Sequence, residues 1–137
     1  MDALFEIERV TYWHGYGTLT RPHTDEFENM MCVYEGYKNF SIGRTEDRKW
    51  FYVGTEGYND EYSPVEFVAP DYKRYPLLEK AVIKTIHIGP GDCMYIPAYY
   101  FHQVASSPGV TIGVATFFKP YHQTIDLVNN GLMSGII

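Results

Sequence analysis

Short apolar runs, rich in aromatic and β-branched residues and separated by glycine, proline, asparagine or aspartate, follow one another along the chain. Such runs predict strands rather than helices, because these side chains fit the pleated, half-buried surface of a sheet. The pattern predicts strands at Phe5–Trp13, Gly17–Arg21, Asn29–Glu35, Lys38–Gly43, Trp50–Val53, Val65–Phe67, Val82–Ile88, Asp92–Ile96, His102–Ser106 and Gly109–Phe118. Many short strands of this kind indicate an all-β sandwich or barrel.

Helix signals are few. Pro70–Ala81 is the best candidate for a helical turn, because it has a proline near its start and Leu77, Leu78 and Ala81 on a shared face. A second short helix is predicted over Tyr121–Met133. No repeat or linker interrupts the chain, so residues 1–137 are expected to form a single domain.

Composition narrows the class of protein. The chain is 45% hydrophobic and 20% charged, which is typical of a globular domain. It has 11 lysines and arginines against 17 acids and a net charge of −6, so no broad basic surface for nucleic acid is expected. The longest apolar stretch, residues 109–118, is about half the ~20 residues that a membrane-spanning helix needs. The acidic N-terminus favours an intracellular protein, cytoplasmic or nuclear, with an organelle left open.

The two cysteines, Cys32 and Cys93, lie far apart in the sequence and outside any C-x-x-C pair. Neither a redox motif nor a thiolate zinc site is therefore indicated. A chain of this size can bury a sufficient core without a covalent crosslink. We expect both residues to be buried free thiols.

Candidate chemistry begins at His23-Thr24-Asp25, because an extended segment places its first and third side chains on the same face. His102 follows a predicted strand and a proline turn. Two imidazoles and one carboxylate form the ligand triad of non-haem Fe(II) oxygenases. An H-x-D also arises by chance in a chain with five histidines, and a histidine beside a strand is commonly a hydrogen-bonded core residue. The spacing alone leaves both interpretations open.

Lys38 lies within the apolar predicted strand YEGYKNFSI. A cation on a half-buried strand is costly unless it meets an anion, and a carboxylate cosubstrate would supply one. A lysine that faces solvent on the barrel exterior satisfies the same pattern.

Three segments together resemble a known family: TRPHTDEFENMMCVYEGYKNFSI at 20–42, SPVEFVAPDYKRYPLLEKA at 63–81 and IGPGDCMYIPAYYFHQV at 88–104. They are similar, in the same order and with the same spacing, to the JmjC-type cupin-like Fe(II)/2-oxoglutarate oxygenases. The resemblance is strongest to the small hydroxylase branch, which includes an asparaginyl hydroxylase. It extends from about Trp13 to Lys119.

The resemblance implies an eight-stranded double-stranded β-helix, the barrel also called a cupin or jelly-roll fold. It implies that His23, Asp25 and His102 are iron ligands and catalytic residues. Lys38 would pair with the distal carboxylate of 2-oxoglutarate, which is consumed together with O₂.

The resemblance also implies three finer details of the same pocket. The Thr20 hydroxyl would share the distal carboxylate of 2-oxoglutarate, and Asn29 would line the pocket. Ala115 stands where the asparaginyl hydroxylase has a pocket asparagine, so one polar contact is expected to be missing.

The function implied is hydroxylation of a protein side chain or a small molecule. The chain has little of the N-terminal region that normally buttresses the barrel, which favours a homodimer or a larger complex. A non-catalytic cupin-like subunit of such a complex is therefore the alternative function. A cupin with another divalent ion and no 2-oxo acid is a third interpretation, and Lys38 argues against it.

Overall fold

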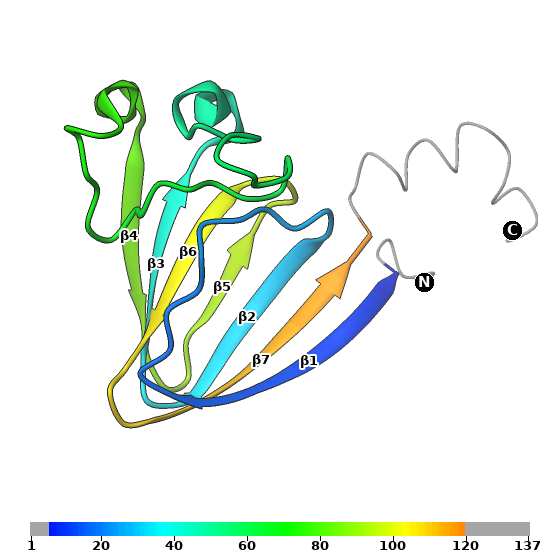
Figure 1. The fold of residues 1–137 in the computed structure, drawn as a ribbon. Helices are drawn as coiled ribbons and strands as arrows, with labels where there is room; N and C mark the ends of the chain where they lie inside the picture. The colour runs from blue at the N-terminus through cyan, green and yellow to red at the C-terminus, as the bar shows by residue number, and fades with distance from the viewer. Residues whose placement is uncertain (1–5, 120–137) are drawn as a thin grey trace, which may run out of the picture.

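The computed structural model describes residues 6–119, which form seven antiparallel strands in two facing sheets and two short 3₁₀ helices (Figure 1). The elements are β1 (Ile7–Tyr16), β2 (Glu28–Glu35), β3 (Lys38–Gly43), η1 (Thr45–Trp50), η2 (Pro76–Lys80), β4 (Ile83–Ile88), β5 (Cys93–Ile96), β6 (Phe101–Ser106) and β7 (Val110–Phe118). One sheet has the strand order β1-β7-β2-β5, and the other has the order β4-β3-β6. This is the predicted all-β cupin or jelly-roll fold, with one strand fewer in these residues than the eight expected.

The main core lies between the two sheets. Inward and outward side chains alternate along β2 and β7, as expected for strands that bury one face. The first sheet contributes Met31, Val33, Met94, Ile96, Ala115 and Phe117, and the second contributes Phe40, Ile88 and Val104. Apolar contacts between these side chains therefore hold the two sheets together.

Strand β1 lies at the edge of the first sheet and pairs with β7. The pairing is continuous from Arg9 opposite Phe117 to Tyr16 opposite Val110, but Ile7 lies opposite Phe118. Glu8 is thus an extra residue on β1, which makes this position a β-bulge.

A second apolar cluster lies at the end of the barrel that carries η1 and η2 (Figure 1). It contains Phe51, Val65, Phe67, Tyr75, Leu78 and Phe101. The strands predicted at Trp50–Val53 and Val65–Phe67 are wrong. Trp50 ends η1, and Phe51, Val65 and Phe67 are buried in this cluster from segments that are not strands.

Two other predictions of local structure need correction. The strand predicted at Gly17–Arg21 is wrong, because the segment hydrogen-bonds to residues 104–107 around one isolated bridge, between Leu19 and Ala105, without forming a regular strand. Of the predicted helical segment Pro70–Ala81, only Pro76–Lys80 is helical, as η2. The helix predicted over Tyr121–Met133 lies outside the described residues.

The prediction of two free thiols is also wrong, because Cys32 and Cys93 form a disulfide across β2 and β5. The two residues are directly opposite in the strand register, although they are 61 residues apart in sequence. Cysteine spacing carries no information on this register, so the bond could not be predicted from the sequence. Between residues 6 and 119, no helix is long and apolar enough to cross a membrane.

Candidate metal and cosubstrate site

A cavity of about 320 Å³ opens between the two sheets. Its lining includes every residue that the sequence analysis named as a ligand or pocket residue: His23, Asp25, His102, Lys38, Thr20 and Asn29. Their roles remain predictions, but the fold brings all six side chains to one cavity.

His23, Asp25 and His102 form a compact group. One ligand atom from each residue lies within 4.8 Å of the other two, and His102 Nε2 lies 3.6 Å from Asp25 Oδ2. His23 is not part of a regular strand. Its backbone pairs with that of His102 through two hydrogen bonds, of 3.0 and 2.8 Å. This bridge joins the H-x-D segment to β6 and brings the distant histidine to the other two residues.

Backbone carbonyls orient both imidazole rings. His23 Nδ1 lies 2.7 Å from the carbonyl oxygen of Arg21, and His102 Nδ1 lies 3.0 Å from that of Tyr100. A carbonyl can only accept, so each Nδ1 carries a proton, and in the neutral form of either ring the lone pair is on Nε2. Burial, and secondarily the neighbouring His23, lower the pKa of His102 to about 4. His102 is therefore neutral near pH 7, which is the form that binds a metal.

The donor set fits a first-row divalent metal. Two imidazole nitrogens and one carboxylate oxygen match the facial triad of non-haem Fe(II) sites, which leaves further positions open for a cosubstrate. The two carbonyl contacts supply the outer-shell hydrogen bonds that metal-binding histidines normally make.

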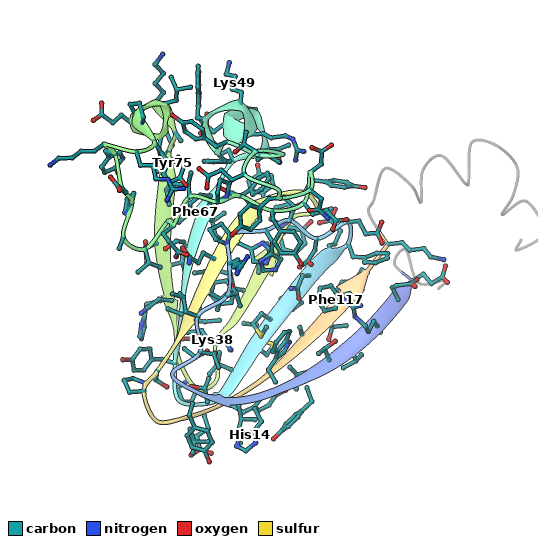
Figure 2. The ribbon with its side chains drawn as sticks, in the orientation of Figure 1. His14, Lys38, Lys49, Phe67, Tyr75 and Phe117 are labelled. Atoms are coloured by element: carbon teal, nitrogen blue, oxygen red, sulfur yellow. A yellow bond between two sulfur atoms is a disulfide. The ribbon has the colours of Figure 1, made fainter. Side chains whose placement is uncertain are left out.

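Lys38 points into the space between the sheets and is only 6% exposed (Figure 2). The interpretation that it faces solvent is therefore wrong. Its Nζ donates a hydrogen bond of 3.0 Å to Ser106 Oγ, and residues 6–119 offer it no carboxylate within 4.0 Å. Burial lowers the pKa of this ammonium. A cation buried with one neutral partner fits an anionic ligand.

Thr20 and Asn29 present polar atoms to the same cavity. Thr20 Oγ1 accepts a hydrogen bond of 2.9 Å from the backbone N–H of Val104, which leaves its own hydroxyl hydrogen to donate elsewhere. Asn29 is 4% exposed, and its Oδ1 is the buried side-chain atom that lacks a hydrogen-bond partner within the described part of the chain. An unsatisfied buried amide oxygen indicates an unseen ligand or water.

The cavity has two polar ends and an apolar middle. The metal group and Asn29 lie at the same end. Asn29 is opposite Ile96, the last residue of β5, and in the turn that follows, the Tyr99 N–H bonds to the carbonyl oxygen of Asp25. Lys38 lies at the other end, opposite Ser106, four residues beyond His102 on β6. Four residues of a strand span roughly 13 Å. Apolar side chains of Met31, Phe40 and Val104 line the cavity.

Other lining residues were not found from the sequence. They include Arg9, Trp13, Tyr62, Ser106, Thr111 and Phe117. His14 is exposed and also borders the cavity. Ala115 is fully buried in the core. The alternation of β1 could have indicated Arg9 and Trp13, but only with the pairing of β1 to β7 in hand.

Comparison with known proteins identifies the family. Residues 3–124 match the family described as "Cupin-like domain". The chain belongs to this family. Its relatives with JmjC names place it among the JmjC-type cupins.

Three relatives illustrate the range of this family. The chain is 30% identical over 123 residues to human "Bifunctional peptidase and (3S)-lysyl hydroxylase JMJD7", covering 74% of this chain and 39% of that protein. It is 27% identical over 116 residues to human "HSPB1-associated protein 1", covering 82% and 24%. "JmjC domain-containing protein E" of Dictyostelium discoideum is 28% identical over 138 residues, covering 77% and 39%. The chain thus spans no more than 39% of these relatives.

Proposed function

We propose that this cupin-like domain is an Fe(II)- and 2-oxoglutarate-dependent oxygenase that hydroxylates a protein side chain or a small molecule. The observation that carries the proposal is the buried ammonium of Lys38, which has no carboxylate partner among residues 6–119 and shares a cavity with His23, Asp25 and His102. A relative named as a lysyl hydroxylase supports the same class of reaction.

The proposed roles follow from the contacts of each side chain. His23 and His102 would offer Nε2 to the metal, because their Nδ1 protons are held by backbone carbonyls. Asp25 would supply the anionic ligand. When bound, iron and 2-oxoglutarate supply the oxidising chemistry, in which 2-oxoglutarate and O₂ are converted to succinate and CO₂ while the substrate is hydroxylated.

The remaining residues would bind and orient the cosubstrate. Lys38 would pair with its distal carboxylate, and Thr20 would donate its free hydroxyl hydrogen to the same group. Asn29 Oδ1 can only accept a hydrogen bond and 2-oxoglutarate offers no donor, so a water held beside the cosubstrate would be the partner that it lacks. The apolar middle of the cavity suits the methylene groups of a five-carbon diacid and limits the access of water.

Binding measured without turnover tests the proposal. Under nitrogen, Mn(II) and then 2-oxoglutarate are titrated calorimetrically into the protein, with Mn(II) in place of Fe(II). We expect the metal to bind first and 2-oxoglutarate to bind only afterwards. Asp25→Ala should lose both events. His87→Ala is the matched control, since His87 is exposed and hydrogen-bonds to Asn39 outside the cavity. Folded wild-type protein that binds neither ligand would overturn the proposal.

The alternative, a non-catalytic subunit of a larger complex, is favoured by the outer face of β1. Val10, Tyr12 and Tyr16 are 58–64% exposed on this strand. Contiguous exposed apolar side chains mark interaction surfaces. On this alternative, Asp25→Ala and Lys38→Ala would assemble normally with the partner, and 2-oxoglutarate would not bind.

A further inference from the structure

The β-bulge in β1 decides which charge faces the cavity. Residues directly opposite in an antiparallel pair point to the same face of the sheet. Arg9 is opposite Phe117, whose side chain faces the core, so Arg9 lies on the inner face of the sheet, where it lines the cavity and is still exposed. Had the register of Ile7 opposite Phe118 continued without the extra residue, Glu8 would lie opposite Phe117 instead. The bulge therefore places a cation, rather than an acid, at the cavity.

The guanidinium of Arg9 is supported but not neutralised. Its Cζ lies 4.4 Å from the centroid of the Phe117 ring, a cation–π contact with a ring that is itself only 4% exposed. Within residues 6–119, the Arg9 guanidinium has no hydrogen bond or ion pair, and the nearby Glu6 is paired with Lys119 at 2.8 Å. Stacking holds the guanidinium against the ring and leaves its N–H groups open to an incoming anion.

Arg9 lies at the metal end of the cavity, not at the Lys38 end. Its partner Phe117 pairs with Asn29 on the other side of β7. Gly113, four residues away on β7, is the position next to Lys38, where an added Cβ would lie 3.4 Å from Lys38 Cε. Phe117 is labelled near the end of β7, apart from Lys38, in Figure 2. The two cations thus serve different ends of the cavity.

We propose that Arg9 determines substrate specificity by binding a carboxylate of the substrate. The inference rests on the proposed function, in which Lys38 already accounts for the distal carboxylate of 2-oxoglutarate. A guanidinium binds a carboxylate through two parallel hydrogen bonds, which gives both affinity and orientation. The substrate class is therefore an acidic side chain or a small carboxylic acid.

The test compares probes that differ by one charge. N-acetyl-glutamate N-methylamide and its glutamine analogue are titrated calorimetrically into protein saturated with Mn(II) and 2-oxoglutarate under nitrogen. The peptides Gly-Gly-Glu-Gly-Gly and Gly-Gly-Gln-Gly-Gly form a second pair, which separates a small acid from a peptide side chain. In the wild type we expect the glutamate probe of at least one pair to bind roughly tenfold more tightly or better.

Three variants assign this preference to Arg9. Arg9→Gln should abolish it, and Arg9→Lys should retain part of it. Lys84→Gln, which removes a charge from the exposed strand β4 outside the cavity, should retain all of it. Arg9→Gln should also bind 2-oxoglutarate within twofold of the wild type. Circular dichroism and thermal unfolding verify that each variant is folded.

Several results would overturn the inference. A wild type with no preference for glutamate over glutamine, or an Arg9→Gln variant that keeps the preference, removes Arg9 from specificity. A large loss of 2-oxoglutarate affinity in Arg9→Gln would assign Arg9 to the cosubstrate instead. Wild-type protein that binds neither Mn(II) nor 2-oxoglutarate refutes the proposed function itself, and with it the assignment of Arg9 to an oxygenase substrate.

Discussion

Substituting Lys38 by methionine should change protein stability and cosubstrate binding in opposite directions. Methionine is similar in length to the lysine stem and carries no charge. In the wild type without ligand, the ammonium is 6% exposed and donates one hydrogen bond, to Ser106 Oγ. Ser106 Oγ also accepts a hydrogen bond of 2.9 Å from Thr18, so the substitution leaves no orphaned hydroxyl.

The magnitude follows from two terms. A hydrogen bond from a charged donor contributes about 1.5–3 kcal/mol, whereas burying one ion costs several kcal/mol. We therefore expect the ligand-free Lys38→Met variant to be between zero and roughly 2 kcal/mol more stable than the wild type. Removing one partner of a buried charge pair costs about 2–5 kcal/mol of binding. Affinity for 2-oxoglutarate should thus fall roughly 30-fold to several thousand-fold.

Two assays on the same preparations test the predicted changes in stability and in 2-oxoglutarate affinity. Urea unfolding gives the free energy of unfolding, and anaerobic calorimetry on Mn(II)-loaded protein gives the 2-oxoglutarate affinity. Lys84→Met, on the exposed face of β4, should change neither quantity. A Lys38→Met variant that loses more than about 1 kcal/mol of stability yet binds 2-oxoglutarate within twofold of the wild type would show that Lys38 is a structural residue.

Three further predictions concern residues around the site. Reducing the Cys32–Cys93 disulfide should lower the free energy of unfolding by up to about 4 kcal/mol, the chain-entropy value for a 61-residue separation. Urea unfolding with and without reductant measures this loss. The stability of a Cys32→Ser/Cys93→Ser control should not change when reductant is added. Gln103→Leu should lower the free energy of unfolding in urea by roughly 1–3 kcal/mol, because it orphans the buried N–H of Phe67 and also removes the partner of the Val68 N–H; a loss below about 1 kcal/mol would contradict this. The pKa of His102 is about 4 in the folded protein and near 6.5 in the unfolded chain. As the pH falls, the unfolded chain therefore binds the proton before the folded protein does, so the free energy of unfolding of the metal-free protein should fall from pH 6.5 to 4. His102→Gln should flatten thermal unfolding over that window, and an unchanged pH profile would count against the argument.

The sequence predicted the regular strands well because their signal is local. The strand Lys38–Gly43 was predicted with its observed bounds, and the strands near β1, β2, β4, β5, β6 and β7 within a few residues. The strands predicted at Trp50–Val53 and Val65–Phe67 failed because the apolar side chains of a segment of three or four residues can equally be buried without a strand. In a segment of three or four residues, the alternation of apolar and polar positions cannot distinguish a strand from a buried irregular segment.

In the candidate site, too, the features that depend on local sequence could be predicted, and those that depend on strand pairing could not. His23 and Asp25 are two residues apart, so their convergence could be predicted from local geometry, and His102 was added by spacing and resemblance. The disulfide and the inward position of Arg9 depend on which residues lie opposite one another in distant strands. The bulge at Glu8 shifts that pairing by one residue, and nothing in the local sequence marks it. Strand register is therefore the information that the sequence analysis lacked.

The buried polar groups of this domain fall into two kinds, those whose hydrogen bonds are satisfied within the fold and those that are left for a ligand. Gln103 is fully buried, yet its amide bonds to the backbone of Thr20, Phe67 and Val68 as well as to Glu66. Buried Asp47 is likewise paired with Arg44 and the backbone N–H of Val82.

Asn29 and Lys38 differ from these groups, because one has an unpartnered oxygen and the other a charge with a single neutral partner in the described residues. Incompletely satisfied buried groups destabilise a folded protein, so chance would not gather two of them in one cavity beside a His-Asp-His group. The free-energy cost of burying Asn29 and Lys38 is offset only when a ligand binds. A ligand that satisfies both residues must present an anionic group to Lys38 and a hydrogen-bond donor, or a bound water, to Asn29.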